Sequence, residues 1–108
     1  MEFDELIKKA QDVRNAYADL ERQKYGRNWT SEEIALGFMG DVGDLMKLIQ
    51  ACEGVRDIPD PKAKIAHELA DCLWSIIILA QEYEIDLESA FTETMTSLEK
   101  HLEHIQQP

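Results

Sequence analysis

Apolar residues recur every three or four positions along most of the chain, the spacing that places side chains on one face of an α-helix. The first stripe begins at Phe3 and ends near Gly26, and glycine commonly follows the last residue of a helix. Its members are Phe3, Leu6, Ile7, Ala10, Val13, Tyr17 and Leu20. The pattern predicts a first helix that ends just before Gly26 and faces the core with this stripe.

The segment TSEE, residues 30–33, has the sequence of a capping box, with Thr30 as the N-cap and Glu33 as the third helical residue. It predicts a second helix over about residues 31–53. The apolar stripe of this helix is formed by Ile34, Phe38, Val42, Leu45 and Ile49. A helix with one such stripe is expected to pack against a neighbour along it.

Two further helices are predicted after a break that contains Gly54 and two prolines. The third is expected from about Lys62 to Tyr83, and Asp86 can cap the fourth. Their stripes are Ile65, Leu69, Cys72, Ile76 and Leu79 in the third, and Leu87, Phe91, Met95, Leu98, Leu102 and Ile105 in the fourth. No segment alternates apolar and polar residues as a strand does.

Four helices with short connections predict an all-α fold, in which residues 1–108 form a single domain with the architecture of an antiparallel four-helix bundle. The segment 73–79 is apolar around most of the helix circumference, and such a helix is usually covered on every side. Three other helices of this length leave part of it uncovered. We therefore expect the core to be completed by homo-oligomerisation, most simply in a homodimer.

The acidic composition limits the partners of the protein. Eleven Lys and Arg residues against 22 Asp and Glu residues give a formal net charge of −11, which repels nucleic acids and anionic membranes. The longest apolar run, residues 73–80, is far shorter than the ~20 residues that span a bilayer. We thus expect neither a nucleic acid nor a membrane as a partner.

Cysteine usage and the first residues of the chain predict a cytoplasmic protein. The segment MEFDELIKK lacks the apolar core of a signal peptide, and Cys52 and Cys72 form no CxxC pair. The two thiols are expected on the order of 15 Å apart along the axis of a helical hairpin, which is too far for a disulfide. These features indicate the reducing cytoplasm.

Two pairs of carboxylates lie on the flanks of the second and third apolar stripes. Asp41 and Asp44 are three residues apart, as are Glu68 and Asp71, so each pair lies on one side of its helix. In an antiparallel hairpin, Asp44 and Glu68 stand about nine and six residues from the loop, a difference of only ~5 Å in height. The four carboxylates are therefore expected at one level of the groove between the helices.

Four carboxylates in a partly desolvated groove cannot all stay ionised without a cation. An all-oxygen set favours Mg²⁺, Mn²⁺ or Ca²⁺ over zinc or copper. The alternative is a solvated face, on which carboxylate pairs at this spacing are common in an acidic protein. A di-iron bundle would need Glu-x-x-His pairs, but His67 directly precedes Glu68 and points about 100° away from it. His101 and His104 are expected to be exposed.

Gly37, Gly40 and Gly43 interrupt the second helix beside Asp41 and Asp44, although an interior glycine costs about 1 kcal/mol relative to alanine. They leave one flank of the helix without side chains. The gap would allow close packing of another helix, or it would leave room for a ligand beside the carboxylates. Both explanations require a close approach to this part of the backbone.

The motifs GDVGDLMKLI, which begins at Gly40, and ELADCLW, which begins at Glu68, resemble the paired acidic motifs of the MazG-like nucleotide pyrophosphohydrolases. The family pattern is E-E-x-x-E, a spacer and E-x-x-D, and 23 residues separate Asp44 from Glu68 here. The resemblance covers about residues 30–98 and is especially close to the dCTP pyrophosphatase-like branch of the all-α NTP pyrophosphatases. It implies an enzyme that hydrolyses nucleoside triphosphates, dNTPs in particular, to the monophosphate and pyrophosphate, in house-cleaning of the nucleotide pool.

The resemblance also implies Mg²⁺ as the cofactor and Asp41, Asp44, Glu68 and Asp71 as the metal ligands. The all-oxygen ligand set admits Mn²⁺ as well. It implies a homodimer or a dimer of dimers whose subunits contribute to each other's sites. Asp41 and Asp44 stand where the family usually has Glu, so each of these ligands is one methylene shorter.

For substrate binding, the resemblance points to Trp29, in the loop before the second helix, as the residue that stacks on the nucleobase. Arg27, Lys47 and Lys64 are candidate triphosphate contacts by proximity. Each of these cations can instead be a surface charge, and Trp29 can instead close the helix as a hydrophobic staple. Trp74 is expected to pack in the core or in an interface.

The aspartates in place of glutamates and the sparse basic residues leave one alternative, a non-catalytic helical interaction module of the same fold.

Overall fold

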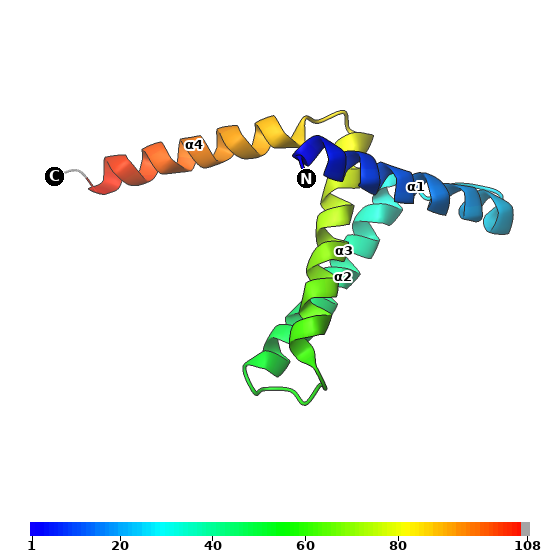
Figure 1. Cartoon of the computed structure of the whole chain (residues 1–108), viewed down its shortest axis with the longest axis horizontal. Helices are drawn as coiled ribbons and strands as arrows, with labels where there is room; N and C mark the ends of the chain where they lie inside the picture. Colours follow the sequence, from blue (N-terminus) through cyan, green and yellow to red (C-terminus); the bar gives the residue numbers. More distant parts are fainter. Residues whose placement is uncertain (107–108) are drawn as a thin grey trace.

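The structure is a computed structural model that describes residues 1–106, and within this range it contains four helices and no strand (Figure 1). The helices are α1 (Phe3–Tyr25), α2 (Ser31–Cys52), α3 (Pro61–Glu82) and α4 (Leu87–Gln106). The predicted all-α class is confirmed. Each helix begins and ends within about one residue of the bounds that the sequence pattern predicted.

The residues that were predicted to start and stop the helices do so in the structure. The hydroxyl of Thr30 accepts a hydrogen bond from the N–H of Glu33, whose carboxylate accepts one from the N–H of Thr30. Asp86 accepts a hydrogen bond from the N–H of Ser89 at 3.1 Å. Gly26 ends α1 with a φ of 73°, a left-handed conformation that suits glycine. These contacts satisfy backbone groups that a helix end leaves without partners.

The helices are arranged as a stem with two arms (Figure 1). The stem is the antiparallel pair of α2 and α3, joined by the turn at residues 53–60, and α1 crosses α3 at the opposite end of the stem. From this end α4 points away in the direction opposite to α1 (Figure 1). The radius of gyration is 17.6 Å, against about 13 Å for a compact chain of this length. In the stem, α2 and α3 pack antiparallel, as predicted. That further copies of the chain complete the core stays a prediction.

The core lies where α1 crosses the stem. Ile78 is fully buried there and packs with Ala10, Ile34 and Ile77. Trp74 packs against this cluster, and its Nε1–H donates a hydrogen bond to the carbonyl oxygen of Ala10 at 3.1 Å. The predicted packing role of Trp74 is therefore confirmed, and its contacts join α3 to α1.

The face that α1 turns to the core agrees with the predicted stripe at Ile7 and Ala10 and differs from it farther along the helix. Val13, Tyr17 and Leu20 are exposed, with 44% to 59% of their surface accessible. The buried residues of α1 are Ala10, Arg14 and Glu21. On this buried face the oppositely charged side chains of Arg14 and Glu21 pair with each other. The displaced apolar residues line a cavity instead.

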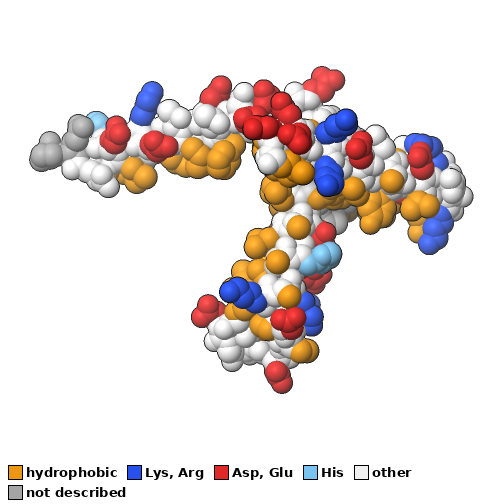
Figure 2. Space-filling model, in the orientation of Figure 1, with side chains coloured by type: hydrophobic (Ala, Val, Ile, Leu, Met, Phe, Trp, Pro, Cys, Tyr) orange, Lys and Arg blue, Asp and Glu red, His pale blue; other side chains and the backbone are white. Residues whose placement is uncertain are grey.

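Several residues predicted to lie in the core are exposed in the single chain. In the stem, Val42, Ile49, Leu69 and Ile76 are more than a third exposed. The exposed apolar residues of α4 are Phe91, Leu98, Leu102 and Ile105. Figure 2 shows apolar side chains gathered along the face of α4 that is turned toward the stem. These surfaces are the ones that the predicted homo-oligomer would cover.

None of the helices within residues 1–106 is long and apolar enough to cross a membrane. Cys52 is exposed, Cys72 is buried, and both are free. His101 and His104 are exposed, as predicted.

Candidate metal centre

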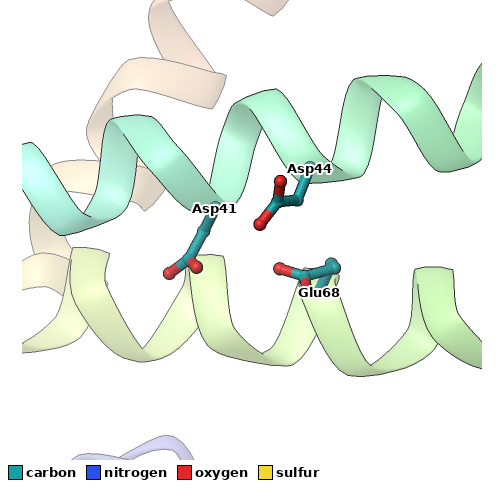
Figure 3. A group of neighbouring side chains, drawn as sticks. All are labelled: Asp41, Asp44 and Glu68. Carbon is teal, nitrogen blue, oxygen red and sulfur yellow. The ribbon is translucent and has the colours of Figure 1, made fainter.

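The packing of α2 against α3 brings three carboxylates together (Figure 3). One oxygen from each of Asp41, Asp44 and Glu68 lies within 4.8 Å of the other two. Asp41 and Asp44 come from adjacent turns of α2, and Glu68 faces them from α3 (Figure 3). We call these three residues the carboxylate group. These three carboxylates therefore lie at one level along the α2–α3 hairpin, as their distances from the turn predicted.

The carboxylate group is held in a partly dry and strongly negative environment. Asp41 and Glu68 are half-buried, whereas Asp44 is exposed. Burial raises the pKa of Glu68, and the neighbouring charges of Asp41, Asp71 and Asp44 raise it further. Burial also raises the pKa of Asp41, with additional repulsion from Asp71 and Asp44. A bound cation would favour the ionised forms and relieve this repulsion.

Oε2 of Glu68 is buried and has no hydrogen-bond partner among the described residues. An unpartnered buried acceptor costs about 1–3 kcal/mol, and more when it is charged, so such an oxygen ordinarily binds a donor or a cation. It belongs to the side chain that approaches Asp41 and Asp44. A set of carboxylate oxygens with one open acceptor fits a hard divalent cation such as Mg²⁺ or Mn²⁺.

Asp71, the fourth predicted ligand, lies outside the carboxylate group. Its Oδ2 is 3.2 Å from Nε2 of His67, one turn earlier on α3. Its charge nevertheless raises the pKa of both Asp41 and Glu68. The structure thus brings three of the four predicted ligands together and places the fourth beside them.

A cavity of about 600 Å³ lies between α1 and the end of the carboxylate group at Asp41. We call it the aromatic cavity, because its lining includes Tyr17, Tyr25, Trp29 and Trp74. Asp41 and Asp71 line it as well. The side chain predicted to stack on a nucleobase therefore shares one cavity with two of the predicted metal ligands.

A second cavity, of about 420 Å³, lies at the other end of the carboxylate group, toward the α2–α3 turn. We call it the basic cavity, because Lys47, Lys64 and His67 line it together with Asp44 and Glu68. Two of the candidate phosphate contacts are thus brought to one place. The carboxylate group lies between an aromatic and a basic cavity.

Arg27, the remaining candidate phosphate contact, is held elsewhere. Its guanidinium group donates hydrogen bonds to both carboxylate oxygens of Glu33, at 2.7 and 3.0 Å. This pairing lowers the pKa of Glu33 to about 2. Arg27 is not among the described residues that line either cavity. It could reach a phosphate there only if its pair with Glu33 opened.

The three glycines of α2 leave open space in the single chain. A Cβ atom added to Gly37, Gly40 or Gly43 would meet no heavy atom within 4 Å among the described residues outside its own helical turns. The close approach expected of another helix therefore does not occur within one chain. The flank of α2 beside Asp41 and Asp44 stays open to a ligand or to a second copy.

Sequence reasoning missed a buried ion pair at the aromatic cavity. Arg14 and Glu21 both line this cavity and form two hydrogen bonds with each other. Positions 10, 14, 17 and 21 follow the same three-and-four spacing as an apolar stripe. That spacing is the signal that could have identified the pair, since it places two opposite charges two turns apart on one face.

Comparisons with known proteins match the part of the chain that contains the carboxylate group. Residues 29–105 match the family model described as the MazG nucleotide pyrophosphohydrolase domain. The chain is also 33% identical over 89 residues to the uncharacterized protein YvdC of Bacillus subtilis (strain 168), with 72% of this chain and 84% of that protein covered. No solved structure gives a significant match. The family match includes α2, α3 and nearly all of α4, and with them the whole carboxylate group.

Proposed function

Because the chain belongs to the MazG nucleotide pyrophosphohydrolase family, we propose that it hydrolyses nucleoside triphosphates to the monophosphate and pyrophosphate. The proposed substrates are dNTPs, which would make the protein an enzyme of nucleotide-pool house-cleaning. The proposed cofactor is Mg²⁺, and Mn²⁺ can replace it. The observation that carries this proposal is the carboxylate group, with its unpartnered Glu68 oxygen, between an aromatic and a basic cavity.

Asp41, Asp44 and Glu68 are the residues that would hold the cation, and Asp71 is the proposed fourth ligand. A divalent cation bound there would neutralise phosphate charge, lower the pKa of the attacking water and stabilise the leaving pyrophosphate. The residues of the chain supply the negative charge that binds such a cation. A protein of net charge −11 would otherwise repel a polyphosphate.

The two cavities suggest how the substrate lies. The aromatic cavity suits the base, with Trp29 as the stacking side chain. The basic cavity suits the far phosphates, because the ammonium groups of Lys47 and Lys64 provide positive charge at its wall. The nucleotide would then follow the groove between α2 and α3, with its α-phosphate beside the carboxylate group.

One observation favours a second candidate function. The exposed apolar face of α4 would suit a non-catalytic interaction module that binds another protein. Such a module would keep the helical fold, and the shorter ligands Asp41 and Asp44 would reflect a lost activity. It would turn over no nucleotide.

Pyrophosphate release from a panel of dNTPs, measured with Mg²⁺, tests the enzymatic proposal. We expect activity in the wild type and a loss of about 100-fold or more in Glu68→Gln and Asp71→Ala, because a metal ligand supports several kcal/mol of transition-state stabilisation. Asp57→Asn, which removes an exposed carboxylate from the α2–α3 turn, is the matched control and should keep its activity. The proposal fails if the wild type acts on no member of the panel, or if both ligand variants match it.

A further inference from the structure

Arg14 and Glu21 form an ion pair on a buried face where apolar side chains are usual. Each residue is only 6% exposed. Two guanidinium nitrogens of Arg14 donate to the two carboxylate oxygens of Glu21, at 2.8 and 3.0 Å. The pairing lowers the pKa of Glu21 and raises that of Arg14, so both side chains stay charged.

Such a pair is a poor way to stabilise a fold. Moving two charges out of water costs about as much as their attraction returns, and apolar residues of similar size are often equally or more stable. Ala10, on the same face of α1, packs in the apolar core. Stability therefore does not explain why this face carries two charges.

Glu21 makes a further contact that leaves α1. Its Oε1 accepts a hydrogen bond from the backbone N–H of Trp29 at 2.8 Å. Trp29 directly precedes Thr30, the N-cap of α2. A carboxylate on α1 thus holds the loop between the two helices at the residue from which the indole projects.

The same three residues line the aromatic cavity beside Asp41 and Asp71. The side chain of Trp29 is accessible at this cavity, since the residue is 46% exposed. The hydrogen bond to Glu21 holds the backbone of Trp29, and with it the point from which the indole extends at this cavity.

We propose that Glu21, oriented by Arg14, is a positioning residue that holds Trp29 at the aromatic cavity for stacking against the base of a nucleotide. The inference rests on the proposed function. Glu21 acts through the Trp29 amide and does not itself need to touch the substrate. Because a loop that is already ordered loses less entropy on binding, removal of this hydrogen bond should weaken substrate binding and leave the reaction at the carboxylate group unchanged.

The variant Arg14→Met/Glu21→Leu tests the role in binding. It removes both charges together, so neither is left buried alone, and we expect its unfolding temperature to equal or exceed that of the wild type. With the dNTP that the wild type hydrolyses best, KM should rise about tenfold while kcat stays within about twofold. The matched control Lys9→Met/Asp12→Leu removes exposed charges from the same helix and should change neither constant. An unchanged KM in the folded double variant would overturn the proposal.

Hydrogen exchange of the Trp29 amide measures the anchor without any substrate. In protein with isotope-labelled tryptophan, this amide should exchange slowly in the wild type and at least about tenfold faster in Arg14→Met/Glu21→Leu, because its acceptor is gone. Glu21→Gln keeps an acceptor oxygen and should keep both the protection and a KM near that of the wild type. Fast exchange of this amide in the wild type would show that the anchor does not exist in solution.

The outcomes separate this inference from the proposed function. If the wild type hydrolyses no nucleotide, the proposed function and the stacking role of Trp29 are both refuted. Amide exchange then still shows whether Glu21 holds the backbone of Trp29. In an active enzyme, Trp29→Ala should raise KM much less in the double variant than in the wild type. Equal effects in both backgrounds would show that the residues act independently and would refute the proposal. If the double variant does not fold, Arg14→Lys, which keeps the charge beside Glu21 but not the two-point hydrogen bonding that orients it, is combined with Trp29→Ala for the same comparison.

Discussion

Glu68 shows at the scale of one residue how burial and charge conflict in the candidate metal centre. Burial raises the pKa of its carboxyl group, as do the nearby aspartates. When the pKa of a carboxyl group is higher in the folded state than in the unfolded state, where it is about 4.3, the group stabilises the fold at a pH below that unfolded pKa. This contribution to stability is lost as the pH rises through the folded pKa. At neutral pH the ionised Glu68 therefore costs stability unless a cation binds it.

We accordingly expect the metal-free protein to become more stable as the pH falls from 7 toward about 4.5. Glu68→Gln should weaken this dependence and be more stable than the wild type at pH 7 in the presence of a chelator. Below about 4.3 stability should fall, because Glu21 and Glu33, whose pKa values are lowered by arginine partners, become protonated. Thermal unfolding followed by circular dichroism measures each of these effects.

The same experiment with Mg²⁺ at pH 7 provides the control. Mg²⁺ at about 100 times its Kd should stabilise the wild type by about 2.7 kcal/mol and should stabilise Glu68→Gln much less. Asp57→Asn should behave as the wild type does. An equal response to Mg²⁺ in all three proteins would exclude Glu68 as a ligand.

At the scale of the helix, α2 is continuous from Ser31 to Cys52 although it contains three interior glycines. Packing along α3 supports it, since this is the most extensive contact between helices in the structure. The space beside each of these glycines is open in the single chain. The flank of α2 that adjoins the carboxylate group is thus formed by residues of low helix propensity.

Replacement of Gly37 or Gly43 by alanine should raise the free energy of unfolding by about 0.5–1 kcal/mol, because the helical backbone needs no glycine there. Urea denaturation of the metal-free protein measures this change. Gly54→Ala is the matched control and should be destabilising, since Gly54 has a φ of +81° that alanine adopts only with strain. A loss of stability in the α2 variants would contradict the expectation and show that another copy closely approaches this flank in solution.

α1 shows why the bounds of a helix are easier to predict than its orientation. Its end at Gly26 depends on neighbours in sequence, and the prediction was correct. Its buried face depends on which side chains find partners after the helices meet, and there Arg14 pairs with Glu21. Of the predicted stripe, Ile7 and Ala10 reach the core, whereas Val13 and Leu20 are exposed in the single chain.

At the scale of the whole molecule, the single chain exposes more surface than a compact protein of its mass. A compact chain of 12.4 kDa would expose about 6,100 Å², whereas this one exposes 8325 Å². The difference exceeds the ~800 Å² that one partner buries in an interface of standard size. The apolar face of α4 provides part of that surface, which supports the expectation that copies of the chain complete each other's core.

We expect sedimentation equilibrium to give the mass of a homodimer or of a dimer of dimers. Phe91→Glu/Leu102→Glu should lower the mass toward that of one chain, because charges on the apolar face of α4 would have to be buried in the interface. Glu93→Gln/Lys100→Gln changes exposed polar residues of the same helix and should leave the mass unchanged. The mass of one chain at every concentration of the wild type would contradict the prediction.

The sequence by itself determined the four helices, three of their caps and the meeting of Asp41, Asp44 and Glu68. These depend on local patterns and on the register of a short antiparallel hairpin, which the position of its turn fixes. The contact of Asp71 with His67 joins residues four apart on α3, a spacing that places side chains next to each other. Only the tertiary structure decided that Arg27 pairs with Glu33 and that a buried carboxylate of α1 holds Trp29. These contacts depend on helix rotation and on the choice among several charged partners, which the spacing of residues along one helix does not specify.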